Sequence, residues 1–178
     1  SARKSVLHSL NQLAGRLDRA LKSLGATEHA EGELLRITDG LMDAVAESPD
    51  VALASIYLNQ IAGPYAVRHC IEAAIICCVI APTIGNARST VAAALTMNAG
   101  MVRLSDASDY VLSDEERNAV RRHPAESAEL LRRAGVLDQD WLAFVLMHHQ
   151  TAEEVPAGAR LIGMADRYCA MVSARNYR

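Results

Sequence analysis

Apolar residues recur at helical spacing along most of the chain. The first run alternates steps of three and four residues, through Val6, Leu10, Leu13, Leu17, Leu21 and Leu24. This spacing places the leucines on one face of a helix, which Gly25 ends. A second stripe passes through Leu34, Leu41, Met42 and Val45 and predicts a second helix. No stretch shows the strict alternation of a strand, so the pattern predicts an all-α fold.

Turn and capping residues divide the rest of the chain into further helices. Ser48-Pro49 resembles an N-cap followed by proline at the first helical position, and Ser113 to Glu116 resembles a capping box. Asp138 is suited to cap the helix that ends at His148-His149. We expect helices over residues 50–60, 65–81, 87–101, 114 to Pro124, from Pro124 to Gly135, 139–149, and from about 156 to beyond Tyr168.

The length of 178 residues suits one domain with a full core, alone or with a small helical appendage. We place a boundary near residue 50. Residues 1–50 are then an N-terminal helical segment, which could be a linker or a dimerising hairpin, and residues 51–178 are the main domain. The leucine stripe favours plain helix packing over a coiled coil because its heptad pattern is short.

Composition narrows the range of functions. A net charge of -3 and a pI near 6.1 argue against nucleic-acid binding. The most apolar stretch, Ile71 to Ala81, is too short to cross a bilayer, so no membrane insertion is expected. None of the four cysteines forms a CxxC pair, and Cys77-Cys78 lies in an apolar run typical of buried thiols. A reduced, cytoplasmic location is the simplest interpretation.

Histidines are the residues most able to carry chemistry. His8 and His29 stand among polar residues and are expected to face solvent. Four others, His69, His123, His148 and His149, fall on different predicted helices, and Asp166 follows on the last one. Imidazoles and a carboxylate from several helices are what a hydrolytic divalent metal site needs. Spacing alone leaves a structural role open for each of them.

Five segments, in order, resemble the HD-GYP family, a branch of the HD phosphohydrolase superfamily. They are Tyr65 to Cys70, Leu112 to Pro124 with its Arg-His-Pro, Glu126 to Gly135, Trp141 to His149, and Ala159 to Met171 followed by Arg175 to Arg178. The resemblance implies an HD-domain-like helical bundle in a bacterial signalling protein, with further helices beyond Arg178. It also implies hydrolysis of cyclic di-GMP at two or three iron or manganese ions, held by His69, His123, His148, His149 and Asp166.

Three features depart from the family pattern. The family's His-Asp pair and nearby lysine are replaced by Met97, Asn98 and Met101, and Tyr65 stands where some members place a metal-binding glutamate. Asn98 cannot bridge two dications as a carboxylate does, and the thioether of Met97 is a poor ligand for a hard ion. Residues Gln150 to Gly158 also lack the glycine-rich Gly-Tyr-Pro loop of the family.

These departures leave three alternatives. The leading expectation is a degenerate signalling module that has no cofactor and acts through protein contacts or ligand binding. In the second, His123, His148 and His149 hold one iron or manganese ion and some phosphodiesterase activity survives. In the third, the histidines are structural. Family analogy suggests a diguanylate cyclase as protein partner, and a homodimer is possible.

A basic cluster between residues 117 and 133 has two interpretations. Its arginines could contact a phosphate-bearing ligand, or they could form ion pairs with interleaved glutamates on a solvated helix face. The second interpretation is favoured. The arginines are Arg117, Arg121, Arg122, Arg132 and Arg133, and the glutamates are Glu115, Glu116, Glu126 and Glu129.

Overall fold

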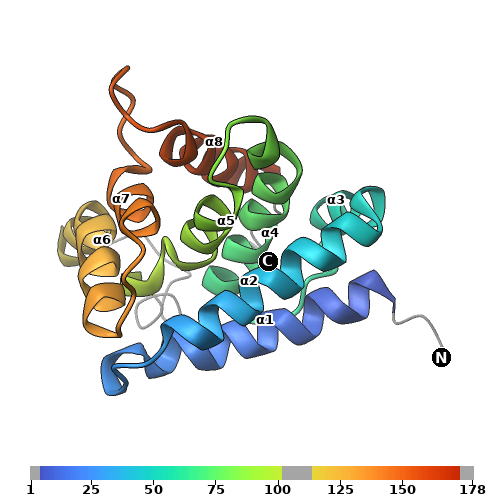
Figure 1. Ribbon diagram of the computed structural model, residues 1–178, viewed down its shortest axis with the longest axis horizontal. Coiled ribbons are helices and arrows are strands. Elements are labelled where there is room, and N and C mark those ends of the chain that lie inside the picture. The colour runs from blue at the N-terminus through green and yellow to red at the C-terminus, as the bar shows by residue number, and fades with distance from the viewer. Residues whose placement is uncertain (1–4, 102–113, 173–178) are drawn as a thin grey trace.

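The computed structural model describes residues 5–101 and 114–172 of the chain (Figure 1). These residues form helices and no strand, which confirms the all-α prediction. The α-helices are α1 (Val6–Ser23), α2 (Glu31–Glu47), α3 (Pro49–Tyr57), α4 (Tyr65–Ile80), α5 (Ala87–Thr96), α6 (Asp114–Arg133), α7 (Gln139–Met147) and α8 (Ala157–Val172). The described residues also form the short 3-10 helices η1 (Leu24–Ala26), η2 (Ala81–Thr83) and η3 (Ala99–Met101).

Helix α4 is the centre of the bundle and packs against α1, α2, α5 and α8. Most of its side chains are buried, because its sequence is apolar on nearly every face. Helix α5 packs closely against it through small residues, since Ala92, Ala93 and Ala94 are fully buried. The side chains of α4 and α5 form the middle of the core. In Figure 1, α6 and α7 lie to the left of these helices, and α8 lies above them, packed against α4.

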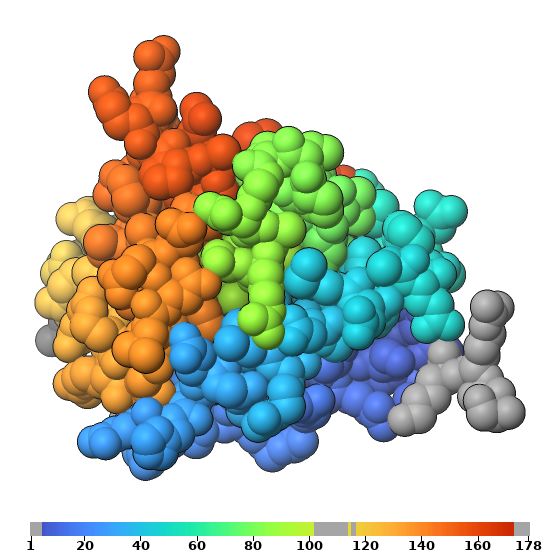
Figure 2. Space-filling view, viewed as in Figure 1, coloured from blue at the N-terminus to red at the C-terminus, as the bar shows by residue number. Residues whose placement is uncertain are grey.

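The N-terminal helices α1 and α2 form an antiparallel pair that packs on the same core. Leu10, Leu17 and Ile37 are fully buried within one hydrophobic cluster that also includes residues of α4, α5, α7 and α8. In the space-filling view the pair, in blue, lies along the lower edge of the molecule against the orange and green segments (Figure 2). The boundary near residue 50 stays a prediction, but no gap in the core marks it.

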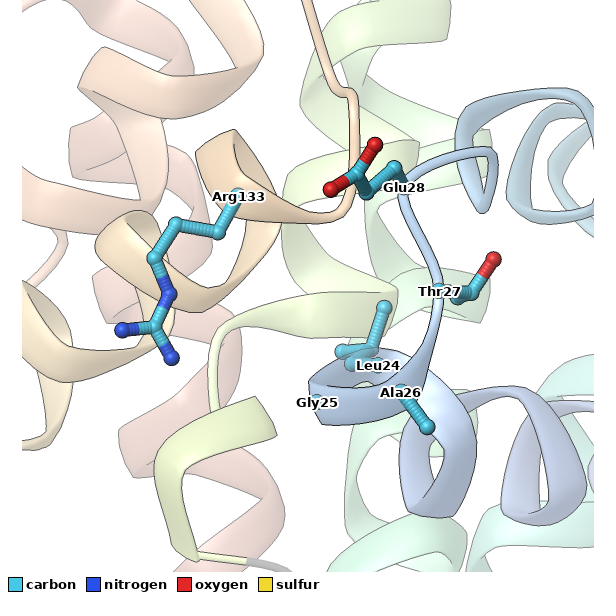
Figure 3. Close-up of a pocket in the computed structure, with 6 residues that line it drawn as sticks. All are labelled: Leu24, Gly25, Ala26, Thr27, Glu28 and Arg133. Carbon is cyan, nitrogen blue, oxygen red and sulfur yellow. The ribbon is translucent and has the colours of Figure 1, made fainter.

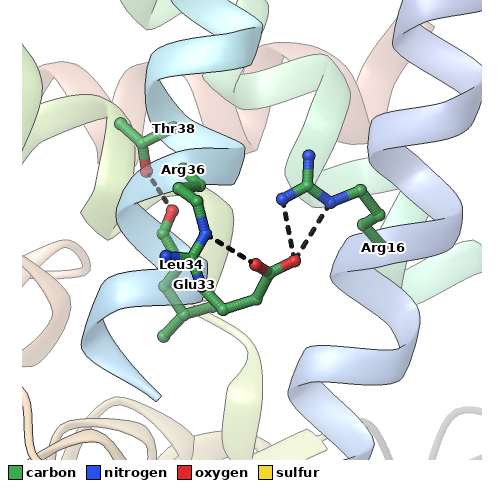
Figure 4. A network of polar contacts seen from close by, with 5 residues as sticks. All are labelled: Arg16, Glu33, Leu34, Arg36 and Thr38. Carbon is green, nitrogen blue, oxygen red and sulfur yellow. Dashed lines mark hydrogen bonds and ion pairs between the residues drawn. The ribbon is translucent and has the colours of Figure 1, made fainter. Parts of the chain in front are cut away.

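A carboxylate joins the two N-terminal helices at their surface. Glu33 of α2 accepts hydrogen bonds from Arg16 of α1, with the Nε of Arg16 at 3.0 Å, and from Arg36 one turn along α2 at 3.1 Å (Figure 4). Both arginines are substantially exposed, so this network orients the helix pair more than it stabilises it.

The turn after α1 is held against the turn between α6 and α7. The amide of Ala30 donates to the carbonyl of Ala134 at 2.9 Å, and Leu137 donates to the carboxylate of Glu31 at 3.0 Å. Gly135 has a φ of +90°, and a Cβ there would lie 2.2 Å from the carbonyl oxygen of Glu28, so only glycine fits. A surface hollow beside this contact is lined by residues 24–28 and Arg133 and contains none of the predicted site residues (Figure 3).

Two predicted helix boundaries are wrong. The helix expected over residues 87–101 ends at Thr96, and η3 follows it. The hydroxyl of Thr96 donates a hydrogen bond to the carbonyl oxygen of Ala92. The helix break expected at Pro124 is absent, since α6 runs through it from Asp114 to Arg133. The cap at Asp138 is confirmed, because its carboxylate accepts from the amide of Trp141 at 3.0 Å. The capping box at Ser113 falls outside the described residues.

One described segment passes the length and hydropathy test for a membrane span. It is Tyr65–Thr83, which comprises α4 and η2, and 61% of its most apolar window is buried inside the fold. Burial of this kind is what the central helix of a packed bundle shows, so the test is weak evidence for a membrane helix.

Candidate metal centre

Three histidines from two helices converge at one edge of the bundle. His123 lies on α6, while His148 and His149 follow the last residue of α7. One ligand atom from each lies within 4.8 Å of those of the other two. His123 and His148 are buried, whereas His149 is exposed, so one of the three imidazoles is accessible to solvent. His8 and His29, expected to face solvent, are both exposed.

The position of the paired histidines is set by how α7 is anchored. Asp138 caps its first turn, and the indole of Trp141 is completely buried. The indole Nε1 donates to the hydroxyl of Thr96 at 2.8 Å, which ties α7 to the end of α5. Helix α7 ends after Met147, so His148 occupies the C-cap, where the last helical carbonyls lack backbone donors.

The backbone fixes which ring nitrogen of each buried histidine carries hydrogen. His148 Nδ1 lies 2.6 Å from the carbonyl oxygen of Val145, and His123 Nδ1 lies 2.6 Å from that of Val120. A carbonyl only accepts, so both Nδ1 atoms are donors and both Nε2 atoms carry lone pairs in the neutral rings. These Nε2 atoms are 3.3 Å apart. Two facing acceptors repel each other unless a cation lies between or in front of them.

Burial keeps both imidazoles in the neutral form that binds metal. It is the largest cause that lowers the pKa of His148, to about 4, and the nearby charge of His149 adds to it. Burial likewise lowers the pKa of His123 below its ordinary value, although the hydrogen bond to Val120 opposes this. Neutral imidazoles are the ligand form, so His123 and His148 do not need to lose protons to bind a cation at neutral pH.

His69 and Asp166, the other two predicted ligands, form a separate pair. The Nε2 of His69 on α4 lies 2.7 Å from a carboxylate oxygen of Asp166 on α8, and the ring of Tyr65 stacks on His69. Burial acts to raise the pKa of Asp166, but the hydrogen bond and charge of His69 outweigh it, and the pKa is lowered. The resulting carboxylate is close enough to act on the charges of His123 and His148.

Met97, Asn98 and Met101, predicted to replace a His-Asp pair and a lysine, lie as follows. Met97 is completely buried in the hydrophobic core, and Asn98 is hydrogen-bonded to the thiol of Cys70. Met101 ends η3, whose Gly100 amide donates to Ser127 of α6 at 2.9 Å. The described donor set therefore fits a single ion with imidazole ligands. Within the described residues no carboxylate joins the histidine group, as a bridged centre of two or three metals would need.

Glycines allow α8 to approach the end of α7. A Cβ on Gly163 would lie 2.1 Å from the carbonyl oxygen of His148, and a Cβ on Gly158 would lie 2.5 Å from the ring of Phe144. The close approach at Gly163 brings the helix that carries Asp166 against the residue that carries the buried imidazole. No family motif marked this glycine, and its role became visible only from the helix packing.

The cysteines and arginines add no second reactive centre among the described residues. All four thiols are free, and burial raises the pKa of Cys70, Cys78 and Cys169 to about 12, so they stay protonated. On α6, Arg122 pairs with Glu126 at 3.2 Å, as the solvated-face interpretation predicts. The side chains of Glu115 and Glu116 are outside the described part of the chain.

Comparisons of the chain with protein-family models, with curated proteins and with solved structures found no match. The resemblance to the HD-GYP family stays a prediction.

Proposed function

We propose that this chain is an HD-GYP-like bacterial signalling module that holds one divalent metal ion and does not cleave phosphodiesters. Its ligands are His123, His148 and His149, and it acts in the cytoplasm through protein contacts or ligand binding. The observation that carries the proposal is the pair of facing Nε2 atoms, 3.3 Å apart, with both Nδ1 atoms held by backbone carbonyls. Metal-binding histidines commonly use such an outer hydrogen bond to fix the tautomer.

The choice of ion follows from the ligands. Three imidazoles suit zinc, cobalt, nickel, copper or ferrous iron, whereas manganese and magnesium prefer more oxygen ligands. The exposed side at His149 leaves a coordination position for water or for a group from a partner. The carboxylate of Asp166 lies outside this set and contributes negative charge that offsets part of the charge of the ion.

We propose the loss of phosphodiester cleavage because Met97 and Asn98 occupy the positions of the predicted His-Asp pair. Cleavage by a metal pair requires one ion to activate water and a second to neutralise the leaving oxygen, and a shared carboxylate holds them together. Asn98 is neutral and is hydrogen-bonded to the thiol of Cys70, and the side chain of Met97 is buried in the core. No described acidic side chain takes over the bridging position within the histidine cluster.

Action through protein contact is supported by exposed apolar side chains at the end of α3 and on α8. Tyr57 and Leu58 are each 63% exposed, and Met164 and Met171 are 61% and 77% exposed. The hydroxyl of Tyr57 contacts that of Tyr168, so these side chains belong to neighbouring helices. A diguanylate cyclase is the partner suggested by family analogy, and a second copy of the chain is the other candidate.

The proposal is tested by one assay series on the purified chain. We expect it to bind one equivalent of zinc or cobalt and to leave cyclic di-GMP intact in the presence of iron, manganese or zinc. A second candidate, a single-metal hydrolase, is favoured by the open coordination side at His149. Steady turnover that scales with bound metal would establish that candidate and contradict the first. Absence of metal binding and of any thermal shift would leave the histidines a structural role.

A further inference from the structure

Helix α6 contains a proline in its interior, directly after a predicted metal ligand. Pro124 lies ten residues into a helix that continues to Arg133 without a break. Proline has no amide hydrogen, so Pro124 cannot donate to the carbonyl of Val120, four residues earlier, and its ring crowds that carbonyl. Proline is the least favourable residue in a helix interior, and its presence there calls for a local reason.

The carbonyl that Pro124 leaves without its helical donor is the one that His123 uses. The Nδ1 of His123 lies 2.6 Å from the carbonyl oxygen of Val120. This bond runs back along the same helix turn, to the residue three positions before the histidine. In an uninterrupted helix the amide of residue 124 would donate a hydrogen bond to the carbonyl oxygen of Val120, and that carbonyl would point along the helix axis.

His148 reaches the same arrangement by a different route. Its Nδ1 lies 2.6 Å from the carbonyl oxygen of Val145, again three residues earlier. Helix α7 ends at Met147, so this carbonyl belongs to the last turn and has no regular helical donor. Both buried imidazoles are thus held by orphan carbonyls, one produced by the end of a helix and the other by a proline inside one.

We propose that Pro124 is a positioning residue for the histidine cluster. By removing the backbone donor for Val120, it reserves that carbonyl for His123 Nδ1 and directs the Nε2 lone pair of His123 towards His148. The expected effect of Pro124 on metal affinity rests on the proposed metal site, but the tautomer of His123 can be measured without metal.

Pro124→Ala separates this role from a structural one, because the two predict opposite results. Alanine restores the backbone donor and is far more favourable in a helix, so the metal-free variant should be at least as stable as the parent chain. We expect the nitrogen chemical shifts of the His123 ring to move from the Nδ1–H form towards the Nε2–H form. We also expect cobalt affinity, measured by visible absorption of the full chain, to fall by about 10-fold, as for loss of an outer-shell partner.

Pro82→Ala is the matched control, since Pro82 is exposed in η2 and outside the cluster. It should leave both the ring shifts and the cobalt affinity unchanged. If Pro124→Ala keeps the tautomer and the cobalt affinity of the parent chain, the positioning role is overturned. If the parent chain binds no cobalt, the proposed metal site fails, and the ring shifts alone then decide the role of Pro124. A variant that loses helicity in the metal-free state would show that the proline serves the fold, and would also overturn the inference.

Discussion

The carbonyl group of His148 and the α-carbon of Gly163 lie so close that a Cβ on residue 163 would stand 2.1 Å from the carbonyl oxygen. This contact presses α8 against the end of α7 at the residue that contributes the most deeply buried imidazole of the cluster. A backbone oxygen cannot rotate away as a side chain can, so any larger residue must displace one of the two helices.

Gly163→Ala should therefore move His148 and weaken metal binding. We expect about 10-fold lower cobalt affinity and an altered cobalt absorption spectrum, with a loss of about 1–3 kcal/mol in the free energy of unfolding from overpacking. Gly158→Ala is the control on the same helix pair, because its Cβ meets the ring of Phe144 rather than the backbone of His148. It should lower stability while the cobalt spectrum stays that of the parent chain. Equal spectral changes in both variants would contradict a specific effect on His148.

Removal of a ligand should abolish the site with little change in surface charge. His148→Gln keeps a polar side chain but loses the Nε2 lone pair, and we expect zinc affinity to fall by more than the 10- to 100-fold typical of outer-shell changes. His29→Gln is the matched control, since His29 is exposed and outside the cluster. Calorimetric titration with zinc measures both. Unchanged affinity in His148→Gln would remove His148 from the ligand set.

The metal-free fold should lose stability as the solution is acidified. Burial lowers the pKa of His148 from 6.5 to about 4 in the folded chain, whereas the unfolded chain keeps the ordinary value. Between these two pH values the unfolded chain binds more protons, so acid favours unfolding. The stabilising contribution of the neutral ring is full above pH 6.5 and falls by about 3 kcal/mol as the pH drops to about 4.

Urea unfolding in the presence of a chelator measures this dependence. His148→Gln should show a shallower decline over the same pH window, because it lacks the group that titrates. Identical pH profiles for the parent chain and the variant would contradict the assignment of the effect to His148.

The hydrogen bond between Trp141 and Thr96 should contribute measurably to stability. Thr96→Val leaves the buried indole Nε1 without its acceptor, which costs about 1–3 kcal/mol. Thr90→Val is the control, because the Thr90 hydroxyl donates only to the carbonyl of Asn86, which also accepts from the Thr90 amide. Urea unfolding followed by the fluorescence of Trp141, the sole tryptophan, compares the two. A stability loss in Thr90→Val as large as that in Thr96→Val would refute the specific role of the indole bond.

The helical framework was predictable because apolar spacing and caps are local signals. The leucine stripe of α1 becomes its buried face, and Asp138 caps α7 as its sequence indicates. The errors arose where tertiary contacts override local signals. At the end of α5 the hydroxyl of Thr96 donates to the carbonyl of Ala92 and accepts from Trp141. Within α6 the carbonyl of Val120, which has no amide donor at Pro124, lies 2.6 Å from Nδ1 of His123.

The candidate ligands could be named from residue type and motif, but their grouping could not. His123, His148 and His149 converge because α6 packs against α7, and the apolar pattern of one helix does not reveal which helices pack together. The sequence predicts Asp166 as a metal ligand together with the histidines, whereas in the structure its carboxylate pairs with His69. A proline four residues after Val120 was the available signal for the orientation of His123.

The number of metal ions bound per chain tests the central claim most directly. Equilibrium dialysis of the purified chain against zinc, followed by metal analysis, gives this number, and His123→Gln provides the comparison. We predict one ion per chain and none in His123→Gln, because the part of the chain that the structure describes contains one such group of three imidazoles. Two ions per chain, or the same metal content in the parent chain and in His123→Gln, would contradict a single metal centre built on these histidines.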